Sequence, residues 1–284
     1  MKTRLALLTL SCLALAGAFV YGQGRGGPQP SKLDVVKVKD DLFVIHNDVV
    51  PGNVTVLVTS EGVVIVDDKF AVDFDNIVAE VRKLTPQPIK YVINTHHHGD
   101  HSGGNARMQG LGAQIITSEQ SRRYMVDGNM TGQPAVTFES RGFIHLGGKD
   151  VELYQFGRAH TGGDTFVYFP AQRTLSAGDA FTFGDATPQL VDYANGGSAK
   201  DWPLTLDRAL ALDFDTVVPG HGLVTTKAEL KKFRDETMSV RTQVHDMIVQ
   251  KKTKDDIWAM LQKDHHWSPQ FQLRSVDGLM VELQ

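Results

Sequence analysis

The chain shows alternating patterns of hydrophobic and polar positions, which predict strands and helices in turn. In the first half, short apolar runs rich in β-branched residues predict strands, over 35–38, 42–46, 54–59, 63–66, 89–94 and 113–117. A polar turn at 60–62 joins two of these runs and predicts a hairpin. Residues 73–84 have apolar side chains at helical spacing, and Thr85-Pro86 ends that helix. Shorter helices are expected over 118–124 and from Asn105.

The second half repeats this alternation. It predicts strands over 143–146, 151–156, 165–169, 174–177 and 215–218, and helices over 198–212, 226–250 and 255–261. After Trp267 the pattern is lost, and we expect a loose tail. No internal linker interrupts residues 34–284, so we expect one α/β domain. Helices outside mixed sheets would give a four-layer αββα sandwich with a C-terminal helical extension.

The N-terminus has the features of a cleavable secretory signal peptide over residues 1–21. A basic start, Met1-Lys2-Thr3-Arg4, precedes an apolar run from Leu5 to Leu15 and the small residues Ala16-Gly17-Ala18. The apolar run is too short to span a membrane. We therefore expect a periplasmic or secreted protein without a membrane span. Residues 22–33 are rich in Gly, Pro and Gln and are expected to form a flexible leader.

Charge and cysteine content narrow the choice of partners and ligands. The formal net charge is −4, and removal of Lys2 and Arg4 with a signal peptide makes the mature chain more acidic. This balance argues against nucleic acid and anionic membranes as partners and leaves a small-molecule substrate. Cys12 is the only cysteine and lies within the predicted signal peptide. The mature chain therefore has neither disulfide nor thiolate ligand. The sequence predicts no oligomeric state.

A polar motif at the end of the predicted strand 89–94 is the main chemical signal. The segment Thr95-His96-His97-His98-Gly99-Asp100-His101 contains four potential metal ligands, namely His96, His98, Asp100 and His101. Side chains two residues apart in a strand share a face, so His96 and His98 can point at one ion if extended geometry continues. His97 would then point away. A stretch this polar, with a carboxylate interleaved, indicates a metal site rather than packing.

Three later strand ends have the same form, a polar residue flanked by glycine. They carry His160, Asp179 and His221. Each signal is weak alone, because a lone His or Asp at a strand end is usually a cap or a surface residue. Together with the first motif they form the kind of set that zinc sites use. The seven predicted ligands are His96, His98, Asp100, His101, His160, Asp179 and His221.

The chemistry of these ligands allows a division into two sites. The first would take three histidines, His96, His98 and His160, and leave a fourth position open. The second would take the other motif residues, Asp100, His101 and His221. Asp179 could then bridge the two ions. Imidazole and carboxylate without thiolate suit two Zn²⁺ ions, and would also accept iron or manganese.

The motif His96-x-His98-x-Asp100-His101, together with the three later strand-end ligands, resembles the metallo-β-lactamase-fold superfamily of metal hydrolases. The likeness covers roughly residues 34–224. It implies the αββα sandwich of that superfamily, with the metals at one edge between the sheets, and the same division of ligands.

The resemblance extends to two kinds of member. The stretch from His160 to Pro170 and the helix around Trp202 are similar to secreted β-lactamases of this fold. Those enzymes commonly have Cys where this chain has Asp179, and Lys where it has Thr182. A bridging Asp is instead similar to glyoxalase-II-like thioesterases and lactonases. Redox members replace a ligand His with Glu and add a flavin domain, and this chain does neither.

The function expected from these features is zinc-dependent hydrolysis of an acyl carbonyl in a β-lactam, lactone, ester or thioester. Two cations would lower the pKa of a bridging water to roughly 7, and the resulting hydroxide would attack the carbonyl. Asp100 is the predicted catalytic residue, orienting this nucleophile. The alternatives are a phosphodiesterase of the same fold, which would favour a basic groove, and a non-catalytic metal-binding protein.

Further residues can support or line this site, or have only packing and surface roles. Metal-bound imidazoles usually donate their other N–H to a neighbour. Candidates for such support are Thr95, His97, Asp67 and Thr161. The Gly-rich segment 192–200 could line a substrate pocket with Tyr193, Asn195 and Lys200, or be a surface loop.

Overall fold

The computed structural model describes residues 29–48, 50–184, 190–269 and 272–284. The predicted signal peptide, residues 1–21, and residues 22–28 of the predicted leader lie outside this part. Residues 29–33 have no regular structure, and the Ser31 amide donates to Asp73 Oδ1 at 2.6 Å. Within the described residues, every helix is too short or too polar to cross a membrane.

The first half of the chain builds one sheet, in which neighbours along the chain are neighbours in space. Its order is β1 (Asp34–Lys37), β2 (Leu42–His46), β3 (Val54–Val58), β4 (Val63–Val66), β5 (Ile89–Ile93), β6 (Gln114–Ser118) and β7 (Val136–Phe138). Strands β1 to β4 pair antiparallel, which confirms the predicted hairpin, whereas β4 to β7 pair parallel.

The second half builds another mixed sheet. Its order is β13 (Thr225–Thr226), β12 (Thr216–Val218), β11 (Thr174–Ser176), β10 (Phe166–Phe169), β9 (Lys149–Tyr154) and β8 (Arg141–Leu146). Strands β11 and β12 are parallel, and the other pairs are antiparallel. The short strands β7 and β13 were not predicted, because their two or three residues are partly exposed and form no buried apolar run.

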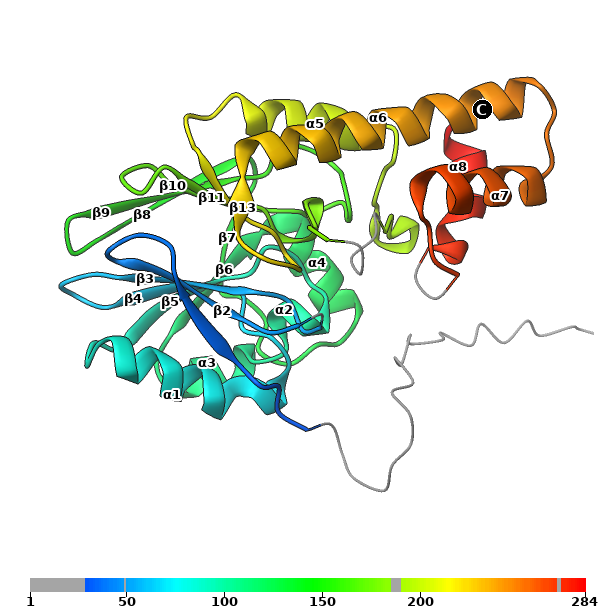
Figure 1. Cartoon of the computed structure of the whole chain (residues 1–284). Helices are drawn as coiled ribbons and strands as arrows, with labels where there is room; N and C mark the ends of the chain where they lie inside the picture. Colours follow the sequence, from blue (N-terminus) through cyan, green and yellow to red (C-terminus); the bar gives the residue numbers. More distant parts are fainter. Residues whose placement is uncertain (1–28, 49, 185–189, 270–271) are drawn as a thin grey trace, which may run out of the picture.

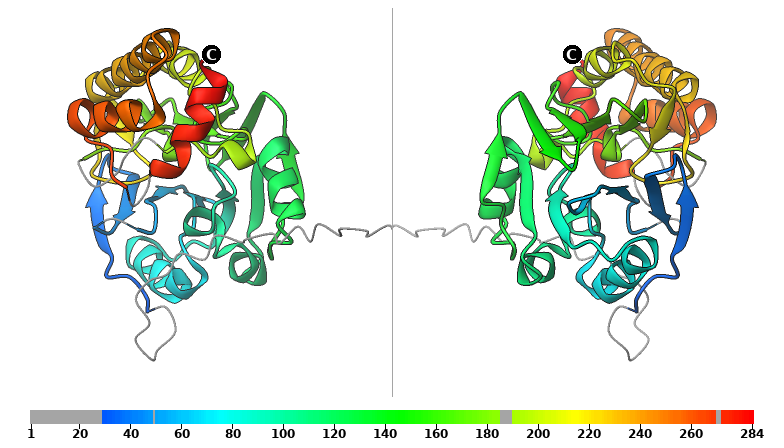
Figure 2. Two further views of the ribbon diagram at one scale, coloured as in Figure 1. Left: turned by 90° about the vertical axis from the view of Figure 1, so that its right-hand side faces the viewer. Right: turned by 90° about the vertical axis from the view of Figure 1, so that its left-hand side faces the viewer.

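Helices cover the outer face of each sheet (Figures 1 and 2). Those beside the first sheet are α1 (Phe74–Leu84), α2 (Gly99–Ser102), α3 (Asn105–Gly110) and α4 (Glu119–Asp127). Those beside the second are α5 (Trp202–Leu210) and the first part of α6 (Lys227–Val249), whereas α7 (Lys254–His265) and α8 (Val276–Glu282) pack against α6 beyond the sheets. Single 3-10 turns lie at 71–73, 178–180, 193–195 and 273–275. The expected loose tail after Trp267 is wrong, because α8 occupies it and buries Val276 and Leu279.

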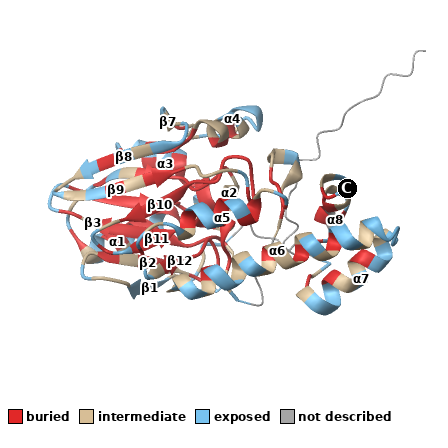
Figure 3. Ribbon diagram, turned by 90° about the horizontal axis from the view of Figure 1, so that it is seen from above, coloured by how far each residue is buried: buried red, intermediate tan, exposed pale blue. Residues whose placement is uncertain are grey.

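Alternation along the strands produces the predicted layers. In β4, Val63 and Ile65 join the apolar cluster that includes α1, whereas Val64 and Val66 join the cluster between the sheets. In the second sheet, Phe166 belongs to the cluster under α5 to α8, and the next residue of β10 faces inward. Because a strand points successive side chains to opposite faces, a continuous apolar run serves layers on both sides. Figure 3 shows this buried interior, and the αββα sandwich is confirmed.

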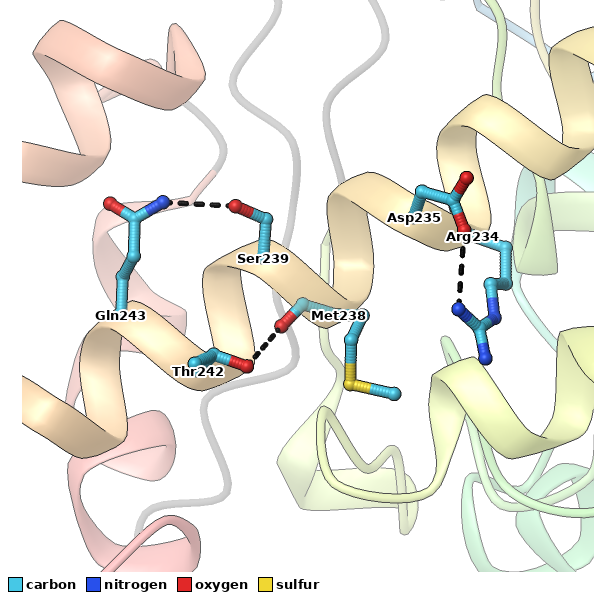
Figure 4. A pocket seen from close by; sticks show the side chains of 6 residues that line it. All are labelled: Arg234, Asp235, Met238, Ser239, Thr242 and Gln243. Atoms are coloured by element: carbon cyan, nitrogen blue, oxygen red, sulfur yellow. Dashed lines mark hydrogen bonds and ion pairs between the residues drawn. The ribbon is translucent and has the colours of Figure 1, made fainter.

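Helix α6 extends beyond the sandwich (Figure 1), and six of its residues line a hollow (Figure 4). The hollow is lined by Arg234, Asp235, Met238, Ser239, Thr242 and Gln243. Gln243 Nε2 donates to Ser239 Oγ and Thr242 Oγ1 to the Met238 carbonyl, each at 2.9 Å, and Arg234 donates to Asp207 of α5. The predicted metal ligands are not among these residues.

Candidate metal centre

The predicted ligands meet at one edge of the sandwich because several strands end there. Strands β4 and β5 run parallel, as do β11 and β12, so their carboxyl ends share an edge. His96 follows β5, Asp179 follows β11 and His221 follows β12. Short loops at these ends therefore project all seven predicted side chains toward one another.

The local geometry of the histidine motif differs from the expected extension of the strand. Strand β5 ends at Ile93 and the histidines follow on a bend, so extended geometry is not what aligns them. The bend is held by Asp67, whose carboxylate accepts from the Thr95 amide at 2.7 Å and from Thr95 Oγ1 at 2.8 Å. Helix α2 then carries Asp100 and His101.

His96, His98 and His160 form what we call the histidine half. His98 Nδ1 lies 3.1 Å from His96 Nε2 and 3.0 Å from His160 Nε2. Two nitrogens bound to one tetrahedral zinc at about 2.05 Å would be about 3.3 Å apart. The three donors therefore fit a single cation.

The outer nitrogen of each histidine in this half has its own acceptor. His96 Nδ1 donates to Thr95 Oγ1 at 3.1 Å, since that hydroxyl gives its proton to Asp67. His98 Nε2 donates to Asp192 Oδ2 at 2.9 Å, and His160 Nδ1 donates to the Leu190 carbonyl at 2.5 Å. With the proton fixed on the outer nitrogen, each inner nitrogen keeps a lone pair for a metal.

Asp100, His101 and His221 form the mixed half. His101 Nε2 and His221 Nε2 are 3.3 Å apart, and Asp100 Oδ2 lies 3.7 Å and 3.4 Å from them. Asp67 Oδ2 accepts from His101 Nδ1 at 2.8 Å. This half therefore offers two imidazoles and a carboxylate to a second cation.

Asp179 faces both halves. Its Oδ1 lies 3.2 Å from His101 Nε2 and 3.4 Å from His221 Nε2, whereas its Oδ2 lies 3.7 Å from His160 Nε2. Oδ1 is buried and has no hydrogen-bond partner among the described residues. A buried carboxylate whose two oxygens face different halves is what a bridging ligand requires.

The charge state differs between the halves. Burial lowers the pKa of His96 well below its usual value and that of His160 to about 4, because a charged ring loses its hydration. In the mixed half, burial opposes charge, but the carboxylates of Asp179 and Asp100 outweigh it. They hold the pKa of His101 well above its usual range and raise that of His221 to about 10.

Two glycines allow close approach to the mixed half. A Cβ on Gly52 would collide with the His101 ring, and one on Gly220 would collide with Asp179 Oδ1. The Gly52 amide also donates to the Asp100 carbonyl at 3.1 Å, which places the turn before β3 directly over the centre. Larger residues at either position would displace a predicted ligand.

Lys69 supports this turn and was not singled out from the sequence. Its side chain is fully buried, and its Nζ donates to Asn47 Oδ1 and, at 2.6 Å, to the Gly52 carbonyl. Burial lowers the pKa of Lys69 to about 7, although nearby carboxylates such as Asp73 oppose the shift. A lysine directly after two aspartates is typical of a surface position, so the role of Lys69 is evident only from the fold.

Two of the four residues predicted to support the ligands hydrogen-bond to ligand rings, and two do not. Thr95 and Asp67 contact ligand rings as proposed. Thr161 does not; its hydroxyl donates to Asp164 Oδ1 at 2.5 Å. His97 points away from the three inner nitrogens, packs against Tyr124 with ring centroids 5.0 Å apart, and leaves Nδ1 without a partner among the described residues.

The 192–200 segment lies between the histidine half and helix α8. The Asn195 side chain donates to Asp192 Oδ2 at 2.7 Å, and the Tyr193 hydroxyl and the Lys200 amide donate to Glu282 of helix α8. Asp192 itself, which accepts from His98, was missed. An Asp in a Gly-rich loop gives no signal beyond a turn or cap.

Known proteins of one family match this chain in sequence. The sequence model of the Metallo-beta-lactamase superfamily matches residues 47–221. Metallo-beta-lactamase type 2 from Elizabethkingia meningoseptica is 25% identical over 197 residues, spanning 67% of this chain and 76% of the relative. The enzyme of the same name from Bacillus cereus is 27% identical over 199 residues, spanning 66% and 74%.

Solved structures show the same fold. A metallo-beta-lactamase from Pontibacter korlensis superposes with a TM-score of 0.65 at 26% identity, covering 73% of this chain and 99% of that one. DIM-1 metallo-beta-lactamase gives the same TM-score at 20% identity, covering 75% and 98%. Since the family match spans more than half of the chain and includes every residue of both halves, this protein belongs to the metallo-beta-lactamase superfamily.

Proposed function

We propose that the protein is a dinuclear zinc hydrolase that cleaves acyl compounds. The observation that carries the proposal is the placement of Asp179, whose oxygens face the histidine half and the mixed half from between them. A protein that only stored metal would have no need of adjacent sites sharing a carboxylate. Membership of a superfamily of metallohydrolases supports the same reading.

The chain's own residues have distinct tasks in this reaction. The histidine half and the mixed half would each hold one cation, and the bound cations would supply a polarised carbonyl and a water with a pKa near 7. Asp100, whose pKa is held below its usual value by His101 and His221 despite burial, stays ionised. An ionised Asp100 can orient an attacking water and accept its proton.

The substrate we propose is an activated or cyclic acyl compound. Position 182 is Thr, so the chain lacks there the lysine with which the secreted β-lactamases hold a substrate carboxylate, and position 179 is Asp rather than Cys. Lactones, esters and thioesters are therefore favoured over β-lactams within the proposal.

The proposal is tested by metal analysis joined to a substrate panel. A β-lactam, a lactone, a thioester and bis-nitrophenyl phosphate are offered to the protein with zinc, and again after chelation. We expect about two zinc ions per chain, turnover of an acyl substrate, and loss of turnover with the chelator. Turnover of the phosphate diester alone would make the protein a phosphodiesterase, and metal binding without turnover of any compound would make it a binding protein.

A further inference from the structure

The C-terminal helices lie outside the family match, which ends at His221. Helix α6 runs past the edge of the sandwich that carries the metal centre, and α7 and α8 pack against its far end (Figures 1 and 3). From α8, Val276 and Leu279 join the same apolar cluster as Val191 and Ala199. Helix α8 is therefore packed onto the segment between β11 and α5, far from it in the sequence.

The contact between α8 and this segment centres on one carboxylate. Glu282 accepts hydrogen bonds from the Tyr193 hydroxyl at 3.1 Å, from Ser198 Oγ at 2.5 Å and from the Lys200 amide at 3.2 Å. The Glu282 side chain is only 17% exposed. Three donors on one partly buried carboxylate are a strong anchor, because bonds to an ionised acceptor are about twice as strong as neutral ones.

Neighbouring residues of α8 add to this anchor. Ser275, just before the helix, donates its hydroxyl to the Val191 carbonyl at 3.1 Å in a buried position. Gly278 lies against the Tyr193 ring so closely that any Cβ would overlap it. The segment from residue 190 to residue 200 is thus held from outside along most of its length.

From its other side, the same segment holds the histidine half. Asp192 accepts from His98 Nε2, and the Leu190 carbonyl accepts from His160 Nδ1. The Asp192 amide donates to the His160 carbonyl at 2.8 Å, and the Gly162 amide donates to the Asn195 carbonyl at 2.8 Å. Two of the three histidines therefore take their orientation from residues 190–200.

We infer that Glu282 is a positioning residue for the histidine half, acting through the 190–200 segment. The inference rests on the proposed function only in taking His98 and His160 as metal ligands. Loss of the Glu282 carboxylate frees Tyr193, Ser198 and the Lys200 amide, which lets Asp192 and Leu190 move relative to the histidine rings. A ring whose outer nitrogen is less well held binds metal more weakly, and outer partners of this kind are typically worth about 10- to 100-fold in affinity.

The test compares Glu282→Ala and Glu282→Gln with Asp277→Ala in the full-length protein. Asp277 is the matched control, since it is a carboxylate on the same helix that pairs with Lys254 at 2.6 Å and is 72% exposed. The readouts are amide hydrogen exchange over residues 190–200 without metal, and stepwise zinc affinity by competition with a chelator. Neither depends on turnover, so failure of the proposed activity would not be mistaken for failure of this inference.

For Glu282→Ala we expect faster exchange over residues 190–200 and loss of affinity on the order of tenfold for one zinc only. Glu282→Gln, which keeps one acceptor oxygen, should recover part of the affinity, and Asp277→Ala should match the parent protein. If Glu282→Ala folds and binds both zinc ions as tightly as Asp277→Ala, the inference is overturned. Faster exchange with unchanged affinity, or equal weakening of both ions, would overturn it as well.

Discussion

The two halves of the centre are built at the same sheet edge from similar side chains, yet they differ in charge. The histidine half contains only imidazoles, and burial depresses the pKa values of His96 and His160, so these rings are neutral at pH 7. The mixed half places His101 and His221 beside Asp100 and Asp179, and its imidazoles are protonated. The balance between burial and the neighbouring carboxylates decides which histidines carry a proton: burial dominates at His96 and His160, and the carboxylates dominate at His101 and His221.

This difference in protonation determines what a cation must displace when it binds to each half. The inner nitrogens of His96 and His160 carry no proton at pH 7, so a metal can bind them without displacing one. In the mixed half, protons on His101 and His221 already neutralise the carboxylates, and a metal must displace them. A zinc ion that enters the histidine half therefore displaces only water, whereas one that enters the mixed half must displace the protons of His101 and His221.

The largest expected effect comes from removing the carboxylate that orients the nucleophile. Asp100→Ala should lower kcat/KM on the acyl substrate by about 10²- to 10⁴-fold, as expected for loss of a general base. Asn195→Ala, which removes a side chain that donates to Asp192, should stay within about tenfold of the parent. Similar rates in these two variants would contradict the role of Asp100 and the distinction between the halves.

A smaller effect should separate the carboxylates that hold the outer nitrogens. Asp67 supports His101 in the mixed half, and Asp192 supports His98 in the histidine half. Asp67→Asn should lower zinc affinity by about 10- to 100-fold, because its buried carboxylate accepts three bonds. Asp192→Asn should cost about tenfold at the other ion. Calorimetric titration would test this. Asp67 also holds Thr95 beside His96, so Asp67→Asn is expected to weaken both ions, whereas loss of mixed-half affinity in Asp192→Asn would show that the halves are not separate.

The smallest effect is a pH dependence confined to one half. A histidine whose pKa is raised to about 10, such as His221, is protonated below that pH, so metal affinity falls as pH falls. Each displaced proton should cost the second zinc up to about tenfold in affinity per pH unit between pH 8 and pH 6. His160, with a pKa of about 4, adds no such slope over this range. Equal slopes for both zinc ions would remove the basis of the comparison.

Most of the layers and the predicted ligand positions follow from local sequence pattern. The alternation of Val63 to Val66 and the β-branched runs beside it define strands, because each residue of a buried strand must suit one of two apolar layers. Four strand ends with polar residues and glycine predicted that distant histidines would lie together, and the distances agree. Parallel pairing then brings those ends to one edge.

The parts that sequence did not show depend on tertiary contacts. Lys69 and Asp192 are ordinary polar residues until a particular turn or ring is placed beside them. Helix α8 is short, contains Gly278, and is stabilised by packing on the 190–200 segment rather than by its own propensity. The bend that aligns His96 depends on Asp67, from another strand.

The origin of the ligands in separate sheets has a thermodynamic consequence. His96 and His101 follow a strand of the first sheet, whereas His221 follows a strand of the second. An ion held by His101 and His221 would therefore act as a cross-link between the layers, and separation of the sheets would have to expel it. Metal occupancy and the folding equilibrium of the whole sandwich would then be linked quantities, so the free energy of unfolding would rise with the free zinc concentration.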